Sequence, residues 1–153
     1  GAIEKAKEEI RRGLPIITDT TMAASGINKT AAGKFGIEVH CFIGDEDVKA
    51  KAKESGMTRS AVSVEKAAGC YPECIYAVGN APTALMRLYE LIEEKKIRPA
   101  LIIGVPVGFV NVVEAKELIL RTDVPAIVAR GRKGGSNIAA AICNALMYEA
   151  GGR

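Results

Sequence analysis

Cationic and glycine residues alternate in one short stretch near the end of the chain, RGRKGGSN, residues 130–137. Arg130, Arg132 and Lys133 are its charged side chains, and its glycines let the backbone approach a ligand closely. An apolar, alanine-rich run follows, which predicts a helix with Ser136 as N-cap and a partial positive charge at its start. Arginine can bind carboxylate or phosphate through two parallel hydrogen bonds. The stretch therefore predicts a site for an acidic ligand.

A second stretch, VGNAPTALMRLYELI at residues 78–92, combines a turn with the start of a helix. Gly79 permits an unusual backbone angle, Asn80 can cap the helix, and Pro82 suits a first helical turn. Arg87 follows one or two turns later. The exposed N–H groups of such a helix form an anion site, although the same residues also describe a well-capped helix with no ligand.

Three further stretches carry polar or unusually apolar residues. In TDTTMAASGI, residues 18–27, Asp19 or Thr20 is expected to cap a turn of helix. TRSAVSV, residues 58–64, adds Arg59 between hydroxyl groups. The loop GVPVGFVNVVEAKE, residues 104–117, places several large apolar side chains between glycines, which indicates contact with a flat apolar ligand, contact with another subunit, or a loop folded inward.

Other kinds of chemistry find little support in these residues. The single histidine, His40, lies inside an apolar strand-like run, where a packed side chain is more common than a catalytic base. The order GxxxxGK[ST] is absent, and no GxGxxG follows the first strand. Cys70 and Cys74 would need distant cysteines to complete the four ligands of a zinc site, so we expect no metal site.

Apolar runs and helical segments alternate along the chain and define the elements that position these loops. Strands buried on both faces are expected at residues 15–19, 37–43, 74–78, 99–105 and 124–129. Helices are expected at residues 45–54, 81–95, 112–120 and 137–148. This alternation predicts an α/β fold with a parallel sheet of about five strands between helices, a Rossmann-like three-layer arrangement. Ligands of such sheets bind beyond the carboxyl ends of the strands, where the loops described above are expected.

Composition narrows the class of protein further. The chain has 153 residues, and its formal charge of +3 is too small to predict nucleic-acid binding. No apolar run reaches the length of a membrane span, and GAIEKAKEEIRRG at the start predicts a charged amphipathic helix. Free thiols are expected at all four cysteines. We therefore expect one domain over residues 1–153, located in the cytoplasm.

Several of these stretches, taken together and in order, resemble the precorrin-8X methylmutase family of cobalamin biosynthesis. They are PIITDTTMAASGI, GMTRSAV, AVGNAPTAL, IIGVPVGFVNVVEAKE and RGRKGGSNIAAAICNAL, which span nearly the whole chain. The resemblance implies a parallel α/β homodimer with substrate cavities near the subunit interface and no redox cofactor. It implies an isomerase that moves a methyl group from C-11 to C-12, converting precorrin-8X to hydrogenobyrinic acid or cobalt-precorrin-8 to cobyrinic acid.

A corrinoid substrate is a broad apolar ring with carboxylates at its rim, so the resemblance also implies roles for the loop residues. Carboxylate contacts are expected from Arg59, Arg87, Arg130 and Arg132. Asp19, Thr58, Asn80 and Thr83 are expected at the site as polar groups. Ring contact is expected from the turn that contains Pro106 and Gly108.

The resemblance places the catalytic histidine of the family, the proton donor, upstream of the PIITD strand. The residues before this strand, GAIEKAKEEIRRGL, contain no histidine, and His40 does not match the position. The family histidine is therefore expected upstream of Gly1, in an N-terminal family segment that this sequence lacks, and the catalytic residue is unknown. Two alternatives stay open: a corrinoid-binding relative without activity, and a nucleotide-binding α/β domain that uses RGRKGGSN for phosphate.

Overall fold

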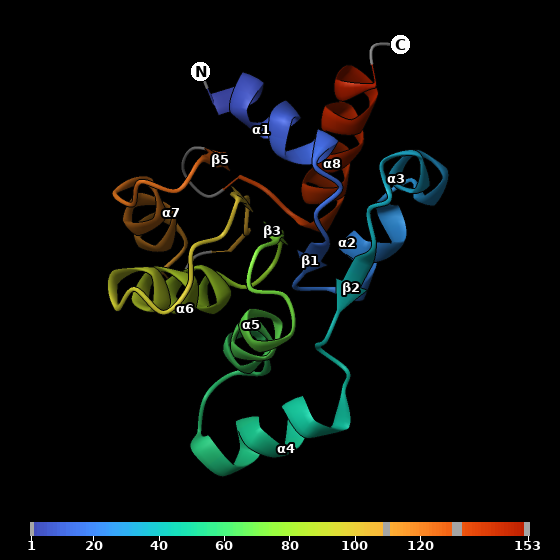
Figure 1. Cartoon of the computed structure of the whole chain (residues 1–153). Coiled ribbons are helices and arrows are strands. Elements are labelled where there is room, and N and C mark those ends of the chain that lie inside the picture. The colour runs from blue at the N-terminus through green and yellow to red at the C-terminus, as the bar shows by residue number, and fades with distance from the viewer. Residues whose placement is uncertain (1, 109–110, 130–132, 152–153) are drawn as a thin grey trace.

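A computed structural model describes residues 2–108, 111–129 and 133–151, and in this part of the chain a parallel sheet forms the centre of the fold (Figure 1). Its five strands lie in the order β2-β1-β3-β4-β5. The strands are β1 (Ile16–Thr18), β2 (Val39–Cys41), β3 (Ile75–Val78), β4 (Leu101–Gly104) and β5 (Ala126–Val128). Each falls inside one of the five expected runs, so the α/β fold with about five parallel strands is confirmed.

The burial of the strands differs between the centre and the two edges of the sheet. Every residue of β1, β3 and β4 is buried, as their continuous apolar runs predict. In β2 and β5 every residue is only half-buried. The expectation that all five strands are buried on both faces is therefore wrong for these two, because each has a neighbouring strand on one side only.

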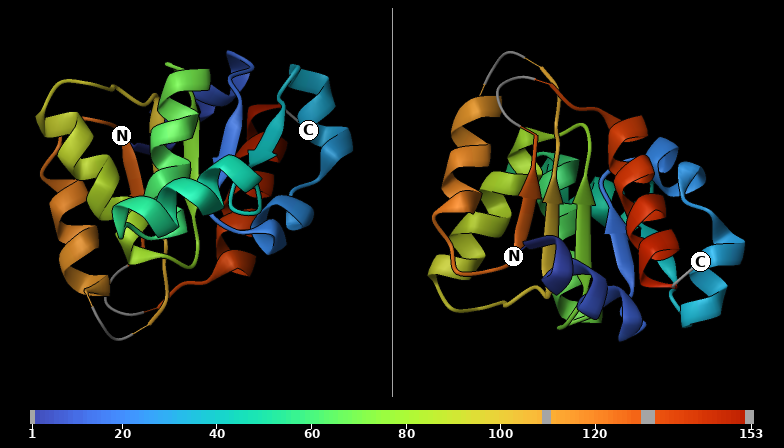
Figure 2. Two further views of the ribbon diagram at one scale, coloured as in Figure 1. Left: turned by 90° about the horizontal axis from the view of Figure 1, so that it is seen from below. Right: turned by 90° about the horizontal axis from the view of Figure 1, so that it is seen from above.

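Four helices cover one face of the sheet (Figure 2): α1 (Ala2–Arg11), α2 (Thr21–Gly26), α3 (Lys29–Phe35) and α8 (Ser136–Ala150). Their apolar side chains form one cluster with the side chains that point to this face, including Ile16, Ile75 and Ile103. Small residues let α2 and α8 approach closely, since a Cβ added to Gly26 would lie 2.8 Å from the Cβ of Ala140.

Three helices pack on the opposite face: α5 (Arg59–Cys70), α6 (Pro82–Glu93) and α7 (Val112–Leu120). Leu85, Leu88 and Ile119 are fully buried there against the side chains of Ile17, Tyr76 and Ile102. The two helical layers on either side of the sheet confirm the expected three-layer arrangement.

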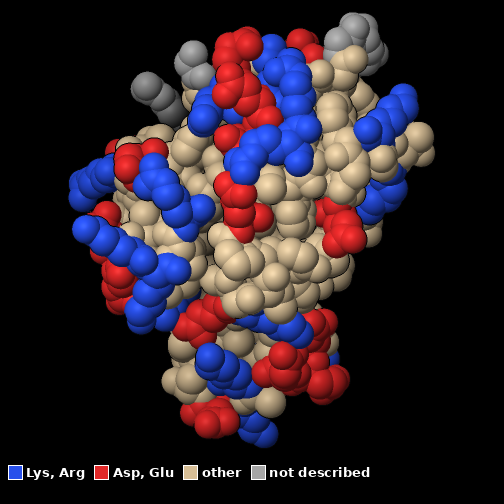
Figure 3. All heavy atoms as spheres, viewed as in Figure 1, with Lys and Arg blue, Asp and Glu red and all other residues tan. Residues whose placement is uncertain are grey.

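Helix α4 (Glu46–Ser55) lies outside these layers and packs on α5. Figure 3 shows it as a separate projection that carries side chains of both charges. Val48 and Ala52 of α4 bury a small apolar cluster against Val62 of α5. Because this cluster is small, ion pairs form much of the remaining contact.

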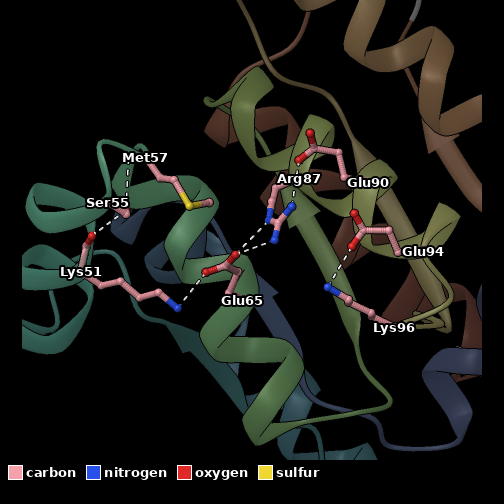
Figure 4. Close-up of polar contacts among 8 residues, drawn as sticks. All are labelled: Lys51, Ser55, Met57, Glu65, Arg87, Glu90, Glu94 and Lys96. Atoms are coloured by element: carbon pink, nitrogen blue, oxygen red, sulfur yellow. Dashed lines mark hydrogen bonds and ion pairs between the residues drawn. The ribbon is translucent and has the colours of Figure 1, made fainter.

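Glu65 of α5 joins α4 to α6 through two ion pairs (Figure 4). Its Oε1 lies 3.1 Å from Nζ of Lys51 on α4, and its Oε2 accepts hydrogen bonds from Nε and Nη2 of Arg87 on α6 at 3.0 and 2.7 Å. Nη1 of Arg87 donates to Glu90 at 3.1 Å. Burial alone would raise the pKa of Glu65, but the bonds from Lys51 and Arg87 outweigh it and lower the pKa.

The expected helices are present with small differences at their ends, and three helices were missed. The expected helix 112–120 coincides with α7, and the amphipathic helix at the start is α1. The residue before α6 is Ala81 rather than Asn80, and the N-cap of α8 is Gly135 rather than Ser136. The missed helices are α3, α5 and, beyond the single turn expected after Asp19 or Thr20, α2. No helix in the described residues has the length and apolar character of a membrane span.

Replacing Glu65 by glutamine tests the ion pairs that attach α4 and α6 to α5. A carboxyl whose pKa is lowered in the folded state stabilises that state above its ordinary pKa of 4.5, and this contribution disappears as the pH falls through the lower value. We expect Glu65→Gln to reduce the free energy of unfolding at pH 7 by about 1–2 kcal/mol. Urea unfolding between pH 7 and pH 3 should show this difference shrinking below pH 4.5. Glu54→Gln, at an exposed position of α4, is the control; a difference that stays constant down to pH 3 would contradict the assignment.

Candidate active site at the carboxyl edge of the sheet

The order of the strands changes direction at β1, which leaves a topological switch point at the carboxyl edge of the sheet. From β1 the chain continues to β2 on one side, and β3 then pairs with β1 on the other side. Loops that leave β1 and β3 diverge at such a point and leave a crevice, which is where open α/β sheets bind ligands. The stretches singled out in the sequence follow β1, β3, β4 and β5 at this edge.

The carboxylate of Asp19 fills the space between the loops after β1 and β3. Its Oδ1 accepts a hydrogen bond from the N–H of Gly79 at 2.8 Å, and its Oδ2 accepts from the N–H groups of Asn80 and Ala81 at 2.9 and 2.8 Å. The side chain is 6% exposed. The amide groups just before α6, which the sequence indicated as an anion site, are therefore occupied by an anion of the chain itself.

The loops after β3, β4 and β5 approach each other so closely that glycine is required at two positions. A Cβ on Gly79 would lie 2.6 Å from Cα of Ser136, and a Cβ on Gly134 would lie 1.9 Å from the carbonyl oxygen of Val105. Gly134 has φ +155. The N–H of Gly135 donates to the carbonyl of Val105 at 2.8 Å. The glycines of the basic stretch thus serve contact between loops in the described part of the site.

Two hydroxyl groups connect the loop after β1 to the start of α8. Oγ1 of Thr20 accepts the N–H of Ala23 at 3.0 Å, so Thr20 is the N-cap of α2, as expected. The same oxygen lies 2.8 Å from Oγ of Ser136. Ser136 begins α8 and uses its hydroxyl group for this contact instead of for capping.

The side chain of Lys116, on α7, binds the backbone of the basic stretch at Lys133. Its side chain is only 3% exposed, and its Nζ donates to the carbonyl oxygen of Lys133 at 2.7 Å. Burial lowers the pKa of Lys116 from its ordinary value. Arg130 and Arg132 lie outside the described residues, whereas Lys133 is exposed at the edge.

Thr58 and Thr83, both expected at the site, come together between α5 and α6. Oγ1 of Thr58 donates to Oγ1 of Thr83 at 3.0 Å, and it also accepts the N–H of Ala61 as the N-cap of α5. Arg59 and Asn80 are exposed beside them at the starts of these helices. Arg87 lies one turn of α6 beyond Thr83, where Glu65 and Glu90 bind its guanidinium group.

Exposed apolar side chains surround these polar groups. Met22 follows β1, Val107 follows β4, and Ile138 lies in the first turn of α8; their exposed fractions are 61%, 45% and 44%. Pro106 is buried and Gly108 is half-buried in the loop after β4. Val105 of the same loop is 0% exposed and belongs to the core under α8, so this part of the loop folds inward, which is one of the alternatives left open by the sequence.

The proton donor that the family resemblance implies has no counterpart assigned at this edge. Its histidine is expected upstream of Gly1, and Gly1 itself lies outside the described residues. His40 belongs to the edge strand β2, where its Nε2 lies 3.0 Å from Glu38 and its ring stacks on Tyr71 with centroids 4.7 Å apart. The position of the histidine upstream of Gly1 therefore stays a prediction of the family resemblance.

The thiols of Cys74 and Cys143 are buried, and burial suppresses their reactivity. Burial raises the pKa of the Cys74 and Cys143 thiols to about 12, so both are protonated at neutral pH. Within residues 2–108, 111–129 and 133–151, no group of histidine, cysteine and acidic side chains forms a metal site.

The structure brings five further residues to this edge: Thr20, Met22, Lys116, Ser136 and Ile138. Thr20 and Ser136 were expected only as helix caps, and the other three were not singled out from the sequence. Only the two exposed apolar residues left a signal, since large apolar side chains next to a capped helix start are unusual on a free surface. The contact between Thr20 and Ser136 and the burial of Lys116 depend on segments that are distant in the sequence. Neither of them could be predicted from the sequence.

Comparison with known proteins shows the family to which the chain belongs. Residues 1–149 match the family model described as precorrin-8X methylmutase. The chain belongs to the precorrin-8X methylmutase family. It is 44% identical to a cobalt-precorrin-8 methylmutase of Leptospira interrogans, and the match covers 95% of this chain and 70% of the relative. It is 46% identical to the protein of the same name from Salmonella typhimurium, over 96% and 69% of the two chains.

A solved structure supports the same membership at the level of the fold. The precorrin-8x methyl mutase of Thermus thermophilus superimposes with a TM-score of 0.89 at 39% sequence identity. The superposition covers 99% of this chain and 74% of the Thermus chain. The family fold is therefore present over the described elements, from α1 to α8.

Replacing Asp19 by asparagine tests the amide cradle at this edge. Asparagine keeps one acceptor oxygen, but its NH₂ group points at backbone N–H groups that in the wild type donate to the carboxylate. We expect Asp19→Asn to lower the free energy of unfolding by about 1–3 kcal/mol, measured by urea unfolding at pH 7. Asp123→Asn, at an exposed ion pair with Arg98, should change it by less than about 1 kcal/mol. Equal effects at the two positions would show that Asp19 has no special role.

Adding a methyl group to Gly79 tests the close approach of the β3 loop to α8. The methyl group meets backbone atoms, which cannot move aside as a flexible side chain can. We expect Gly79→Ala to destabilise the fold by about 1–3 kcal/mol. Gly33→Ala is the matched control, because nothing lies within 4 Å of the added Cβ and alanine favours helix α3. Thermal unfolding of the two variants should shift in opposite directions; a shared direction would contradict the contact.

Proposed function

We propose that this chain, acting as one domain over residues 1–153, isomerises a precorrin-8X-type macrocycle in cobalamin biosynthesis by moving a methyl group from C-11 to C-12. Membership of the methylmutase family supports this role. The observation that carries it in the structure is the combination of exposed apolar side chains with hydrogen-bonding groups at one sheet edge. Precorrin-8X or its cobalt form matches that combination, since each has an apolar ring and a rim of carboxylates.

The apolar part of the macrocycle is assigned to the exposed side chains at this edge. Met22, Val107 and Ile138 come from three different loops, and burying them against a flat ring removes apolar surface from water. The turn that includes Pro106 and Gly108 supplies further ring contact. Holding the ring in one orientation favours migration of the methyl group between neighbouring carbons, because positioning alone can contribute several kcal/mol to a barrier.

The carboxylates of the rim are assigned to the polar residues at the helix starts. Arg59 is exposed in the first turn of α5, and Thr58, Asn80 and Thr83 lie beside it. Arg130 and Arg132 complete the cationic side from the basic stretch. Asp19 contributes by holding the amides of residues 79–81 and thereby the direction in which Asn80 and Thr83 face.

Arg87 is less available than the other arginines to bind a carboxylate at the rim of the macrocycle. Its Nε, Nη1 and Nη2 already donate to Glu65 and Glu90, and these bonds raise the pKa of its guanidinium group against the effect of burial. A substrate carboxylate in this position would compete with Glu65. We therefore expect Arg87→Ala to cost more stability than affinity.

The chain is further proposed to work as a cytoplasmic homodimer without nucleic acid, metal or redox cofactor. Cys41, Cys70, Cys74 and Cys143 are all free, which suits a reducing compartment. The net charge of +3 is too small to favour nucleic-acid binding. The family resemblance supports the homodimer.

An absorption assay with precorrin-8X and with cobalt-precorrin-8 tests the proposed isomerisation, because conversion of the macrocycle changes its spectrum. Conversion of either macrocycle supports the methylmutase. Tight binding without conversion in both would support a corrinoid-binding relative, and binding of a mononucleotide without corrinoid binding would support a phosphate-binding domain instead.

Single substitutions at the carboxyl edge test which residues hold the macrocycle. We expect Arg59→Ala and Arg130→Ala each to weaken corrinoid binding about 10-fold or more, as the loss of a charge-assisted hydrogen bond implies. Met22→Glu should weaken it similarly, because it places a negative charge beside an acidic ligand. Affinity is measured by absorption titration. Arg98→Ala is the control, since Arg98 precedes β4 at the opposite edge; equal losses in this variant would remove the proposed site.

A further inference from the structure

The buried lysine of α7 lies on a side of the helix that is otherwise apolar. The other buried residues of α7 are Val112, Ala115 and Ile119, each at most 1% exposed, and Lys116 is 3% exposed. An ammonium group is costly to bury, and lysine is almost never buried without a polar partner. Burial accordingly lowers the pKa of Lys116. An apolar residue would suit the fold at least as well, so the lysine indicates a role beyond folding.

The partner of Lys116 lies outside its own helix. Lysines in the last turn of a helix commonly bind the free carbonyl groups there and complement the helix dipole. Lys116 is instead the fifth of the nine residues of α7 (Val112–Leu120), and its Nζ donates to the carbonyl oxygen of Lys133 at 2.7 Å. This hydrogen bond therefore holds the segment that leads from β5 into α8.

The segment held in this way contains two consecutive glycines. Gly134 and Gly135 follow Lys133 with φ +155 and +130, and glycine has more backbone freedom to lose than any other residue. The N–H of Gly135 donates to the carbonyl of Val105 at 2.8 Å. The bond from Lys116 fixes the carbonyl of Lys133 on the other side of Gly134. Together the two bonds fix the backbone from which the Lys133 side chain extends.

The side chain of Lys133 is available to an acidic ligand. It is exposed at the carboxyl edge just before α8, and with the described residues its ammonium group forms no ion pair. The guanidinium group of Arg87, by contrast, is bound by Glu65 and Glu90. A cation whose backbone is already fixed loses less freedom when a carboxylate binds, and this preorganisation raises affinity.

We propose that Lys116 is a positioning residue for the acidic substrate: it holds the backbone of Lys133 so that the ammonium group of Lys133 binds a carboxylate at the rim of the macrocycle. The proposal rests on the proposed function and adds these two lysines to its site. The buried charge of Lys116 is then kept for binding at a cost in stability, a compromise that is common in functional sites. Removing this charge should separate binding from folding.

Lys116→Met removes the ammonium group but keeps an unbranched side chain of similar length. Absorption titration with precorrin-8X should show binding at least about 5-fold weaker than in the wild type, because the basic segment is no longer preorganised. The midpoint of urea unfolding should rise or stay within about 0.5 M of the wild type, since an apolar side chain replaces a buried charge. Lys53→Met, the same change at an exposed position of α4, should alter neither quantity. Unchanged affinity, or a midpoint lowered beyond this range, would overturn the proposal.

The same substitution in a chain that also carries Lys133→Met shows through which group Lys116 acts. Lys133→Met alone should weaken binding about 10-fold, as the loss of a charge-assisted hydrogen bond implies. Adding Lys116→Met should then cost no more than about 2-fold, because the group that it positions is already gone. Equal losses in the two backgrounds, or a Lys133→Met chain that binds as tightly as the wild type, would contradict the assignment while leaving the proposed function intact. A wild type that binds no corrinoid would overturn the proposed function itself.

Discussion

The carboxylate of Asp19, bound to three successive backbone N–H groups, is the constraint on which the candidate site depends. A buried charge is costly without hydrogen bonds, and here the amides of Gly79, Asn80 and Ala81 supply them at the start of α6, whose dipole also favours an anion. The partners are 60 to 62 residues apart in the chain. Their contact fixes the β3 loop relative to β1, and Gly79 then determines how closely α8 can approach.

The other contacts at this edge extend the same arrangement outward. Thr20 and Ser136 connect α2 to α8, Thr58 and Thr83 connect α5 to α6, and Lys116 holds the end of the basic stretch. Each of these polar groups forms its hydrogen bond with another part of the chain, so the loops are held in place without a ligand. Met22, Arg59 and Ile138 are exposed at this edge and make none of these contacts.

The strands could be predicted from the sequence, whereas the contacts between the loops at the carboxyl edge could not. Nearly continuous apolar runs define β1, β3 and β4 because burial on both faces favours apolar side chains along the whole strand. The short helices α2 and α3 were missed because they are rich in small residues and have few apolar side chains in a helical repeat. From the sequence, Asp19 was expected at the ligand. Its hydrogen bonds to backbone amides could not be predicted, because these amides lie in a loop that only the parallel pairing of β1 and β3 brings near. Ser136 was expected to cap α8, but its hydroxyl group faces Thr20.

In the described residues helix α4 packs mainly on α5, and this has a consequence for the dynamics of the molecule. Detaching α4 uncovers Val48, Ala52 and Val62 but leaves both large clusters on the sheet covered. Regions with few buried apolar contacts open locally at a lower free energy than the core. Helix α4 is therefore a separate unit of local unfolding, whose amide protons exchange with water before those of β3 and β4. The connection from α4 to α5 leads directly to Thr58, so this opening reaches the candidate site without unfolding the sheet.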